Sequence, residues 1–304
     1  MRLTTVLALL AVLCLPPVAI SQISGSAPGA DAARPITLLI RCDDWGMCHA
    51  VNMAAKRAME SGIPISASVM FACPWYQEIV DLLKGHPDVS VGIHLTLNAE
   101  WKNYRWGPVS GASAVPSLVD SLGYFFPSRD LFFSHNPKLD EIERELLAQI
   151  ERAVHSGLQI DYVDYHMGTA VQTPETRAIV ERLASEYHLG ISRYFGERDV
   201  DGFYATPPDR KRDTLIALTR NLPPDSVNLL VFHLGIDTPE MSALSDLNAF
   251  GLPEMSKYRQ AELDALLSQP FQELVRNPRY RITTYRALKA NPGLGSMRRP
   301  AAIE

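Results

Sequence analysis

Short apolar runs rich in β-branched residues alternate along the chain with stretches that repeat apolar residues every three to four positions. The runs predict strands at Ile36–Cys42, Ile63–Phe71, Val89–Leu97, Ile160–Tyr165, near Ile191, Val227–Phe232 and Tyr280–Thr284. The helical spacing predicts helices at Val51–Ser61, Trp75–Lys84, Leu139–Ser156, Pro174–Tyr187, Asp209–Asn221 and Tyr258–Leu267. Because the two patterns alternate, they favour a parallel sheet covered by helices.

The number of such units favours one large α/β domain over two small ones. Roughly seven or eight strand-helix units in one chain predict an irregular (β/α) barrel, which we expect at residues 35–289. An open doubly wound sheet is the alternative, although no G-x-G-x-x-G follows the first strand. Insertions at Asn98–Pro137 and Gly235–Lys257 interrupt the alternation, and such long loops are usually functional or disordered. Residues 290–304 are expected to form a C-terminal tail.

The N-terminus departs from this pattern. Met1 and Arg2 precede an apolar stretch from Val6 to Ile20, which predicts a signal peptide at residues 1–21 and a flexible segment at 22–34. We therefore expect export to the periplasm or outside the cell. The run is short for a membrane span and no second one follows, so we expect no integral membrane domain, with a retained N-terminal tether as the alternative.

Composition narrows the function classes. The 29 basic and 34 acidic residues give a net charge of -5 without long blocks of either sign, which argues against nucleic acid as a partner. Of the four cysteines, Cys14 lies in the predicted signal peptide. The other three, Cys42, Cys48 and Cys73, form no C-x-x-C pair and are odd in number, so a disulfide framework is not expected. Cys42 and Cys73 end apolar runs, where a thiol packs as a small hydrophobic group.

Residues with catalytic chemistry gather where predicted strands end. Asp43 and Asp44 close the first strand, His94 lies near the end of the third, His166 follows the fourth, and His233 follows a late one. Barrel closure brings the carboxyl ends of parallel strands to one mouth, which is where such folds carry their active sites. The sequence therefore predicts that these five side chains meet.

A divalent metal would explain two adjacent carboxylates at a strand end. One Asp oxygen and two neutral imidazoles form a common ligand set that leaves positions open for water and substrate. Each residue also has a simpler interpretation. Asp43 and Asp44 could form a turn and a helix cap, a single His on an apolar strand is often a core residue, and His166 could pair with Asp161 or Asp164 at the surface.

The same residues lie in motifs that resemble those of the YdjC-like carbohydrate deacetylases, a family that includes chitooligosaccharide deacetylases. The resemblance covers about residues 36 to 289 and is most specific in the Asp pair and in "VGIHLTLN". The similar segments are Cys42–Gly46 with Asn52, Gly62–Met70, Val91–Asn98, Glu145 with Gln149, Gly157–Gly168, His233–Gly235, and Tyr258 with Arg259, Glu262, Leu263 and Leu266.

The resemblance implies an irregular (β/α) barrel and metal-dependent removal of N-acetyl groups from amino sugars or short oligosaccharides. Carried over by position, Asp44, His94 and His166 would hold one divalent ion, zinc first, with magnesium, cobalt or nickel as alternatives. Asp43 would be the general base and His233 the general acid. The expected substrate contacts are Trp45, Arg193, Tyr258 and Arg259. A homodimer is a further expectation.

Two positions depart from the family pattern, and other functions stay open. Gly168 stands where many members have a second His, and Leu234 replaces a Pro, which puts the identity of the sugar in doubt. Aromatic residues in the first insertion could stack on sugars or pack the loop onto the barrel, and packing is the commoner fate. A phosphoesterase with the same ligands and a catalytically inactive sugar-binding protein are the alternatives, whereas the sequence lacks G-x-S-x-G and H-E-x-x-H motifs.

Overall fold

The structure is a computed structural model that describes residues 34–301. These residues belong to one compact unit that begins at Arg34. The predicted signal peptide and most of the flexible segment lie outside the described residues, so export stays a prediction. Within residues 34–301, the helices are all too short or too polar to cross a membrane.

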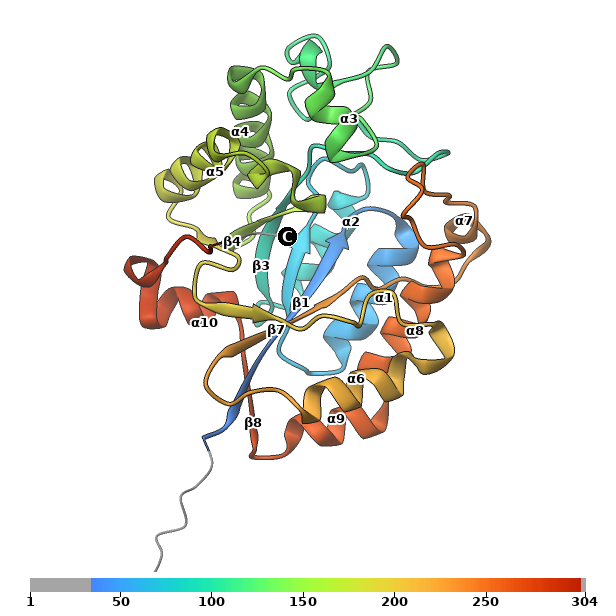
Figure 1. Ribbon diagram of the computed structural model, residues 1–304, viewed down its shortest axis with the longest axis vertical. Coiled ribbons are helices and arrows are strands. Elements are labelled where there is room, and N and C mark those ends of the chain that lie inside the picture. The colour runs from blue at the N-terminus through green and yellow to red at the C-terminus, as the bar shows by residue number, and fades with distance from the viewer. Residues whose placement is uncertain (1–33, 302–304) are drawn as a thin grey trace, which may run out of the picture. The chain divides into compact units, whose positions relative to one another are not determined.

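One parallel sheet runs through the molecule (Figure 1). Its strands are β1 (Ile36–Trp45), β2 (Ser66–Val69), β3 (Ser90–Leu95), β4 (Ile160–Tyr165), β5 (Gly190–Ile191), β6 (Glu197–Asp199), β7 (Val227–Phe232) and β8 (Tyr280–Thr283). Their order is β5-β4-β3-β2-β1-β7-β6, and β8 pairs with β1. All pairings are parallel, so the carboxyl ends of the strands share one edge.

Strand β1 is the centre of this sheet because it pairs with three others. Residues 37–42 pair with β7, while the other edge of β1 pairs with β8 at residues 36–39 and with β2 from Arg41 onward. All ten residues of β1 are buried, which agrees with its nearly continuous apolar sequence. The predicted strand therefore continues three residues farther, through both aspartates to Trp45.

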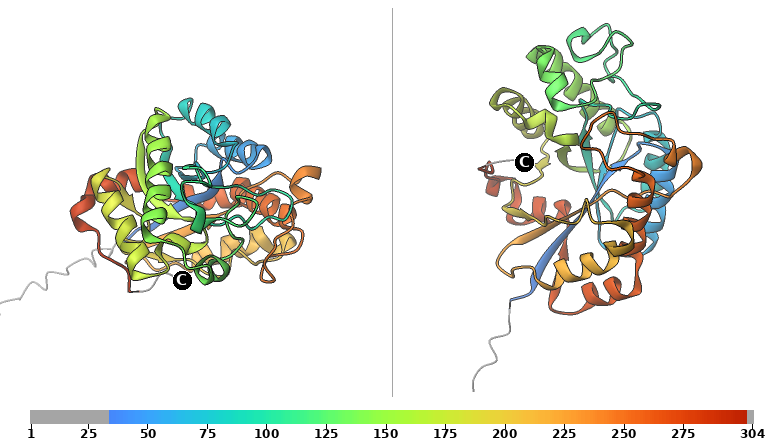
Figure 2. Two further views of the ribbon diagram at one scale, coloured as in Figure 1. Left: turned by 90° about the horizontal axis from the view of Figure 1, so that it is seen from above. Right: turned by 45° about the vertical axis from the view of Figure 1, so that its right-hand side comes forward.

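The sheet curls into a half-barrel and does not close, because β5 and β6 are its two ends (Figure 2). Helices surround the half-barrel on its outer side and at its ends. They are α1 (His49–Glu60), α2 (Tyr76–Lys84), α3 (Arg129–Ser134), α4 (Leu139–His155), α5 (Pro174–Glu186), α6 (Lys211–Arg220), α7 (Pro239–Ser242), α8 (Met255–Leu267), α9 (Gln269–Arg276) and α10 (Tyr285–Leu288). The predicted irregular (β/α) barrel is thereby confirmed in an open form.

The N-terminal end of the half-barrel is closed by α10. Tyr285 is fully buried against Tyr162 of β4, with ring centroids 4.1 Å apart, and against Leu39 of β1. The guanidinium of Arg286 donates from Nε to Asp161 and from its two other nitrogens to the carbonyls of Pro87 and Val89. Tertiary contacts thus fix this four-residue helix, which has too few residues for a periodic sequence signal.

The apolar stripe of α4 predicts a buried face of Ile142, Leu146, Leu147, Ile150 and Val154, and the structure confirms most of it. Ile142, Leu146 and Ile150 are fully buried and Leu147 is partly buried, whereas Val154 is 43% exposed and its neighbour Ala153 faces the core in its place. Cys42 and Cys73 are buried free thiols as expected. The first insertion also packs most of its aromatic residues inward, although Tyr124 is exposed. Those buried are Trp101, Trp106, Phe125, Phe126 and Phe132.

Candidate metal and active site

A cavity of about 880 Å³ opens at the carboxyl ends of the strands. Asp43, Asp44, His94, His166 and His233 all line it, so the predicted meeting of these five side chains is confirmed. Parallel pairing accounts for this, since strands β1, β3, β4 and β7 deliver their last residues to the same edge.

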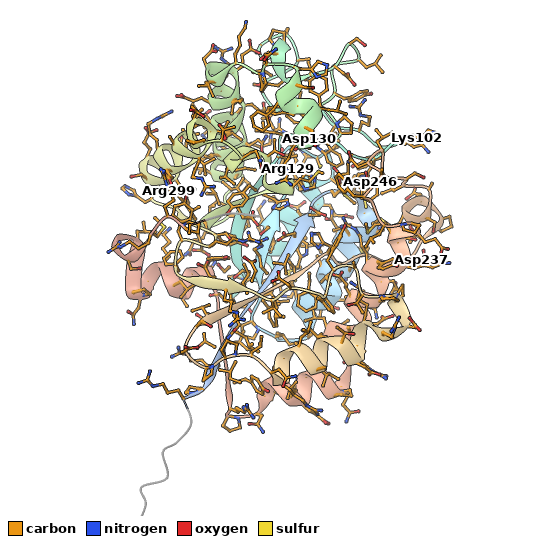
Figure 3. The ribbon with its side chains drawn as sticks, in the orientation of Figure 1. Lys102, Arg129, Asp130, Asp237, Asp246 and Arg299 are labelled. Carbon is orange, nitrogen blue, oxygen red and sulfur yellow. The ribbon has the colours of Figure 1, made fainter. Side chains whose placement is uncertain are left out.

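The two insertions form part of the rim. Trp101 and Asp246 make an antiparallel bridge, and backbone hydrogen bonds of 2.8 Å join Lys102 to Ser245 and Leu247 to Glu100. Figure 3 shows Arg129 and Asp246, one from each insertion, above the carboxyl ends of the central strands. These loops therefore serve as cavity walls, which explains why such long segments are ordered.

A local irregularity turns both aspartates of β1 to the cavity. In a regular strand, neighbouring side chains point to opposite faces. Here the register with β2 shifts between Cys42 and Trp45, and Asp44 has a φ of +63°, in the left-handed region that costs a non-glycine residue free energy. Strain of this kind is common at functional sites, where the surrounding structure holds it in place.

Three ligand-type atoms converge beside Asp44. Its Oδ1 lies 3.3 Å from Nε2 of His94 and 3.4 Å from Nδ1 of His166, and the two imidazole nitrogens are 3.3 Å apart. All three residues are at least 95% buried, and Oδ1 of Asp44 has no hydrogen-bond partner among the described residues. Three atoms that can all act as acceptors face one another here, so a proton or a metal ion must lie among them.

A charged side chain binds each of these three residues through an atom that faces away from the point of convergence. His94 Nδ1 is 2.9 Å from Asp164 Oδ1, and His166 Nε2 is 3.0 Å from Glu100 Oε2. Arg259 Nη2 donates to Asp44 Oδ2 at 2.7 Å. A carboxylate on the far nitrogen is the usual support of a metal-binding His, because it fixes the tautomer and the ring orientation.

A second group of candidate ligands is already occupied by a side chain. Asp43, His94 and Asp164 could also bring three ligand atoms together. However, Arg41 Nε lies 2.7 Å from Asp43 and 3.1 Å from Asp164, and Arg41 Nη2 donates to the other oxygen of Asp43 at 2.8 Å. The guanidinium therefore supplies the positive charge at this position, and the described residues fit one metal rather than two.

Burial and charge set the protonation of the metal-free site. Burial opposes protonation of His94, but Asp164 and Asp43 outweigh it and raise the pKa of His94 to about 10. Glu100 and Asp44 similarly overcome burial and raise the pKa of His166 to about 9. Burial would raise the pKa of Asp43, yet Arg41 lowers it to about 2, so Asp43 is ionised at neutral pH.

His233 lies on the other side of Asp43. Its Nε2 is 4.0 Å from Asp43 Oδ2, its backbone N–H donates to Glu262 at 2.6 Å, and Tyr204 packs edge-on against its ring. The pKa of His233 is lowered from its ordinary value, mainly because the ring is largely removed from water. This imidazole is therefore mostly neutral at neutral pH.

Comparison with known proteins identifies the family. The model of the YdjC-like protein family matches residues 37–277. The chain belongs to the YdjC-like family. A relative from Brevibacillus brevis named carbohydrate deacetylase is 36% identical over 185 residues, which is 60% of this chain and 65% of that protein. Another of the same name from Thermoanaerobacter pseudethanolicus is 26% identical over 83% of this chain and 99% of its own length.

A solved structure supports the YdjC-like fold. It is a protein from Enterococcus faecalis V583 whose proposed role is the cleavage of cellobiose-phosphate. It is 22% identical, covers 84% of this chain and 99% of its own, and superposes with a TM-score of 0.67. At this level of identity, the similarity concerns the architecture alone.

The expected substrate contacts occupy different environments in this YdjC-like protein. Arg193 and Arg259 line the cavity, although Arg193 is engaged by Asp199 in two hydrogen bonds of 2.7 and 2.8 Å. Trp45 is fully buried in the core, and Tyr258 packs near Lys211, so neither belongs to the cavity lining. The motif shows that Trp45 follows the Asp pair in the sequence but not where its ring lies. In the structure the ring packs in the apolar core.

Three residues of the site were missed by the sequence reasoning. Arg41 precedes Asp43 by two positions, and alternate residues of a strand share a face, so its ion pair had a readable signal. Asp164 has the same relation to His166 but bonds His94 across the strands instead. Glu100 is the one acidic residue between positions 95 and 119, but its contact depends on how an irregular loop folds.

Proposed function

We propose that the protein is a metal-dependent hydrolase that removes N-acetyl groups from amino sugars or short oligosaccharides. The observation that carries the proposal is the convergence of Asp44 Oδ1, His94 Nε2 and His166 Nδ1 in the cavity. The relatives named carbohydrate deacetylase supply the reaction class. A sugar is compatible with a cavity of about 880 Å³ that combines many polar groups with aromatic rims.

The chemistry of the three donors favours zinc. One carboxylate oxygen and two imidazole nitrogens form a ligand set that zinc commonly takes, whereas magnesium is usually held by oxygen atoms. Asp44, His94 and His166 would therefore hold a zinc ion.

The residues around the ion divide the proton transfers. A bound divalent ion would act as a Lewis acid toward the attacking water and the acetamide carbonyl. Asp43, ionised and 4.0 Å from His233, takes the proton of the water. Asp43 and His233 are 4.0 Å apart, too far for a direct hydrogen bond, so a water between them would carry the proton to Nε2 of His233, which is mostly neutral at rest. The imidazole then gives it to the leaving nitrogen. Water and amide thereby give acetate and the protonated amine with no net change in the protein.

Arg41 and Arg259 shape the two aspartates for different tasks. Arg41 binds both oxygens of Asp43 and keeps this carboxylate ionised and fixed in orientation. Arg259 binds only Oδ2 of Asp44, which leaves Oδ1 directed at the two imidazoles. Adjacent carboxylates can therefore act separately, one toward the proton and one toward the ion.

Acetate release is the direct test. The purified protein is loaded with zinc and incubated with N-acetylglucosamine and its short oligomers, and acetate and free amine are measured together. We expect equal amounts of both products, loss of activity after chelation, and recovery on adding zinc. Binding of the sugars without product from any of them would overturn the proposal in favour of a sugar-binding protein.

The predicted signal peptide extends the proposal to export of this hydrolase. The argument is the charged start, the apolar stretch from Val6 to Ile20 and the polar segment after it. Mass spectrometry of the protein from the periplasm or medium should find an N-terminus after Ser21. A chain that retains Met1 and sediments with membranes would instead indicate a tether.

A further inference from the structure

Lys211 is an unusual residue to find in the interior. It belongs to α6, is 1% exposed and touches neither the cavity nor any candidate ligand. Its ammonium group donates to the carbonyls of Phe203 at 2.8 Å and Tyr204 at 2.7 Å, and to Glu262 Oε1 at 2.7 Å. All three hydrogens therefore have acceptors. Burying a charge is costly, so such a complete set of partners calls for an explanation.

The carboxylate that pairs with Lys211 also binds the backbone of His233. Glu262 of α8 accepts from Lys211 through Oε1 and from the backbone N–H of His233 through Oε2, at 2.6 Å. This N–H belongs to the first residue after β7, where the strand's own hydrogen bonds end. The ion pair thus fixes the backbone from which the imidazole projects.

The other two acceptors of Lys211, the carbonyls of Phe203 and Tyr204, belong to a loop that also contacts His233. Tyr204 packs edge-on against the His233 ring, with centroids 5.1 Å apart and planes inclined by 69°. Lys211 holds the carbonyl of Tyr204 and that of Phe203, whose ring packs on Phe232 immediately before His233. One ammonium group therefore organises both the strand end and the loop that contacts the ring.

Helix α8 couples this arrangement to the candidate ligands. Arg259 and Glu262 are three residues apart and lie on one face of the helix. Arg259 supports Asp44, and Glu262 supports His233. A shift of α8 would consequently move both supports, and Lys211 is the residue that ties α8 to α6 through a charge.

We propose that Lys211 is a positioning residue for His233, acting through Glu262 and through the backbone of residues 203 and 204. The inference rests on the proposed function, in which His233 delivers a proton to the leaving nitrogen. Lys211 touches no reacting atom. Its role is to hold the imidazole where proton transfer is fast, and a misplacement on the order of 1 Å can cost about 100-fold in rate.

The test uses two substrates that differ in their need for an acid. Removal of an acetyl group from an amine requires protonation of the nitrogen, whereas 4-nitrophenolate leaves 4-nitrophenyl acetate without a proton. In the zinc-loaded full chain, Lys211→Met should lower kcat for an N-acetylated sugar by about 10- to 100-fold with KM nearly unchanged. Ester hydrolysis should change by less than about threefold, because the metal, Asp43 and the carbonyl site remain.

Lys257→Met is the matched control. Lys257 lies on α8, like Glu262, but is exposed, and among residues 34–301 its ion pair is with Glu254 alone. It should leave both activities unchanged. If Lys211→Met does not fold, Glu262→Gln gives the same readout, since it keeps the side chain's size but replaces one acceptor oxygen with a donor, so that one of the two hydrogen bonds is lost and the other is weakened.

The outcomes separate this inference from the function on which it rests. An equal loss with both substrates, or no loss with either, would overturn the role of Lys211. If His233→Ala itself fails to discriminate amide from ester, His233 is not the acid, and the inference fails with it. A wild-type protein that hydrolyses neither substrate would instead overturn the proposed deacetylase.

Discussion

Arg286 and Arg259, which lie at opposite ends of the sheet, use their guanidinium groups in opposite ways. At the N-terminal end, all three nitrogen atoms of the Arg286 guanidinium donate hydrogen bonds, one of them to the fully buried Asp161. At the carboxyl end, Arg259 uses only Nη2, and its Nε and Nη1 are buried without a partner among the described residues. Asp44 Oδ1 and His233 Nδ1 share this condition.

This difference separates stability from function within one fold. Buried polar atoms normally have partners, because leaving one without costs about 1–3 kcal/mol. The N-terminal end satisfies that expectation around α10 and locks the sheet. At the carboxyl end, buried polar atoms of Asp44, His233 and Arg259 have no partner among the described residues, and Asp44 and Met167 have left-handed backbone. Both features destabilise the fold, but they leave polar atoms available for an ion and a substrate.

Removal of one imidazole should produce the largest loss. In His94→Ala or His166→Ala, only two of the three converging atoms remain, so metal content should fall from about one ion per chain to near zero. Acetate release should drop by about 1000-fold or more. Elemental analysis and product assays measure both quantities. If both variants kept the metal at full stoichiometry, the ion would bind elsewhere, and the claim that the carboxyl end of the sheet is the functional end would be wrong.

Asp43, the neighbour of the candidate ligand Asp44, should be needed for turnover and not for metal binding. In Asp43→Asn, the base is lost while Asp44, His94 and His166 stay, so kcat should fall by about 100- to 10,000-fold with metal content unchanged. A parallel loss of the metal would mean that Asp43 is itself a ligand. Normal turnover would show that another group takes the proton.

Much of the architecture was accessible from the sequence because its signals are local. The periods of apolar residues predict most strands and helices and the parallel sheet. Active sites of (β/α) barrels lie at the carboxyl ends of the strands, and this rule predicts the meeting of Asp43, Asp44, His94, His166 and His233. Among the missed elements, strand β6 carries little local signal, because it has three residues, all polar. Helix α9 does carry one, with Pro270 in its first turn and Phe271 and Val275 on a buried face, but it follows α8 so directly that the two look like one helical stretch in the sequence.

The missing parts of the site depend on contacts between distant segments. His94 and Asp164 are 70 residues apart, Asp44 and Arg259 are 215 apart, and His166 and Glu100 are 66 apart. Hydrophobic periodicity says nothing about which polar side chain meets which. The open half-barrel and the burial of Trp45 likewise follow from tertiary packing, which a strand count does not contain.

Metal affinity should rise with pH by a smaller but distinctive factor. Without metal, the pKa values of His94 and His166 are raised to about 10 and about 9, so both rings are protonated at pH 7. A metal needs neutral imidazoles and must displace these protons, so affinity should increase by up to about 100-fold per pH unit between pH 6 and 8 and level off above pH 9–10. Competition with a chromophoric chelator at several pH values measures the slope.

A matched variant sharpens this measurement. Asp164 is the largest cause that raises the pKa of His94, so Asp164→Asn should lower that pKa and bring the slope between pH 7 and 8 closer to about 10-fold per unit. An affinity independent of pH in the wild type would contradict the assignment of the two imidazoles as ligands.

The smallest effect on catalysis is expected at the other end of the sheet. Arg286→Ala removes three hydrogen bonds and leaves Asp161 with weaker neutral donors, namely Ser90, Gln159 and the backbone N–H of Val91. This should lower the free energy of unfolding by about 2–3 kcal/mol and Tm by about 5 °C. At 25 °C, kcat and metal content should stay within about twofold of the wild type, because α10 closes the end of the half-barrel remote from the ligands. Urea unfolding and acetate release on the same preparation measure both. A large loss of turnover without a loss of stability would mean that the two ends are coupled through the sheet, and the division between a locked end and a reactive end would be wrong.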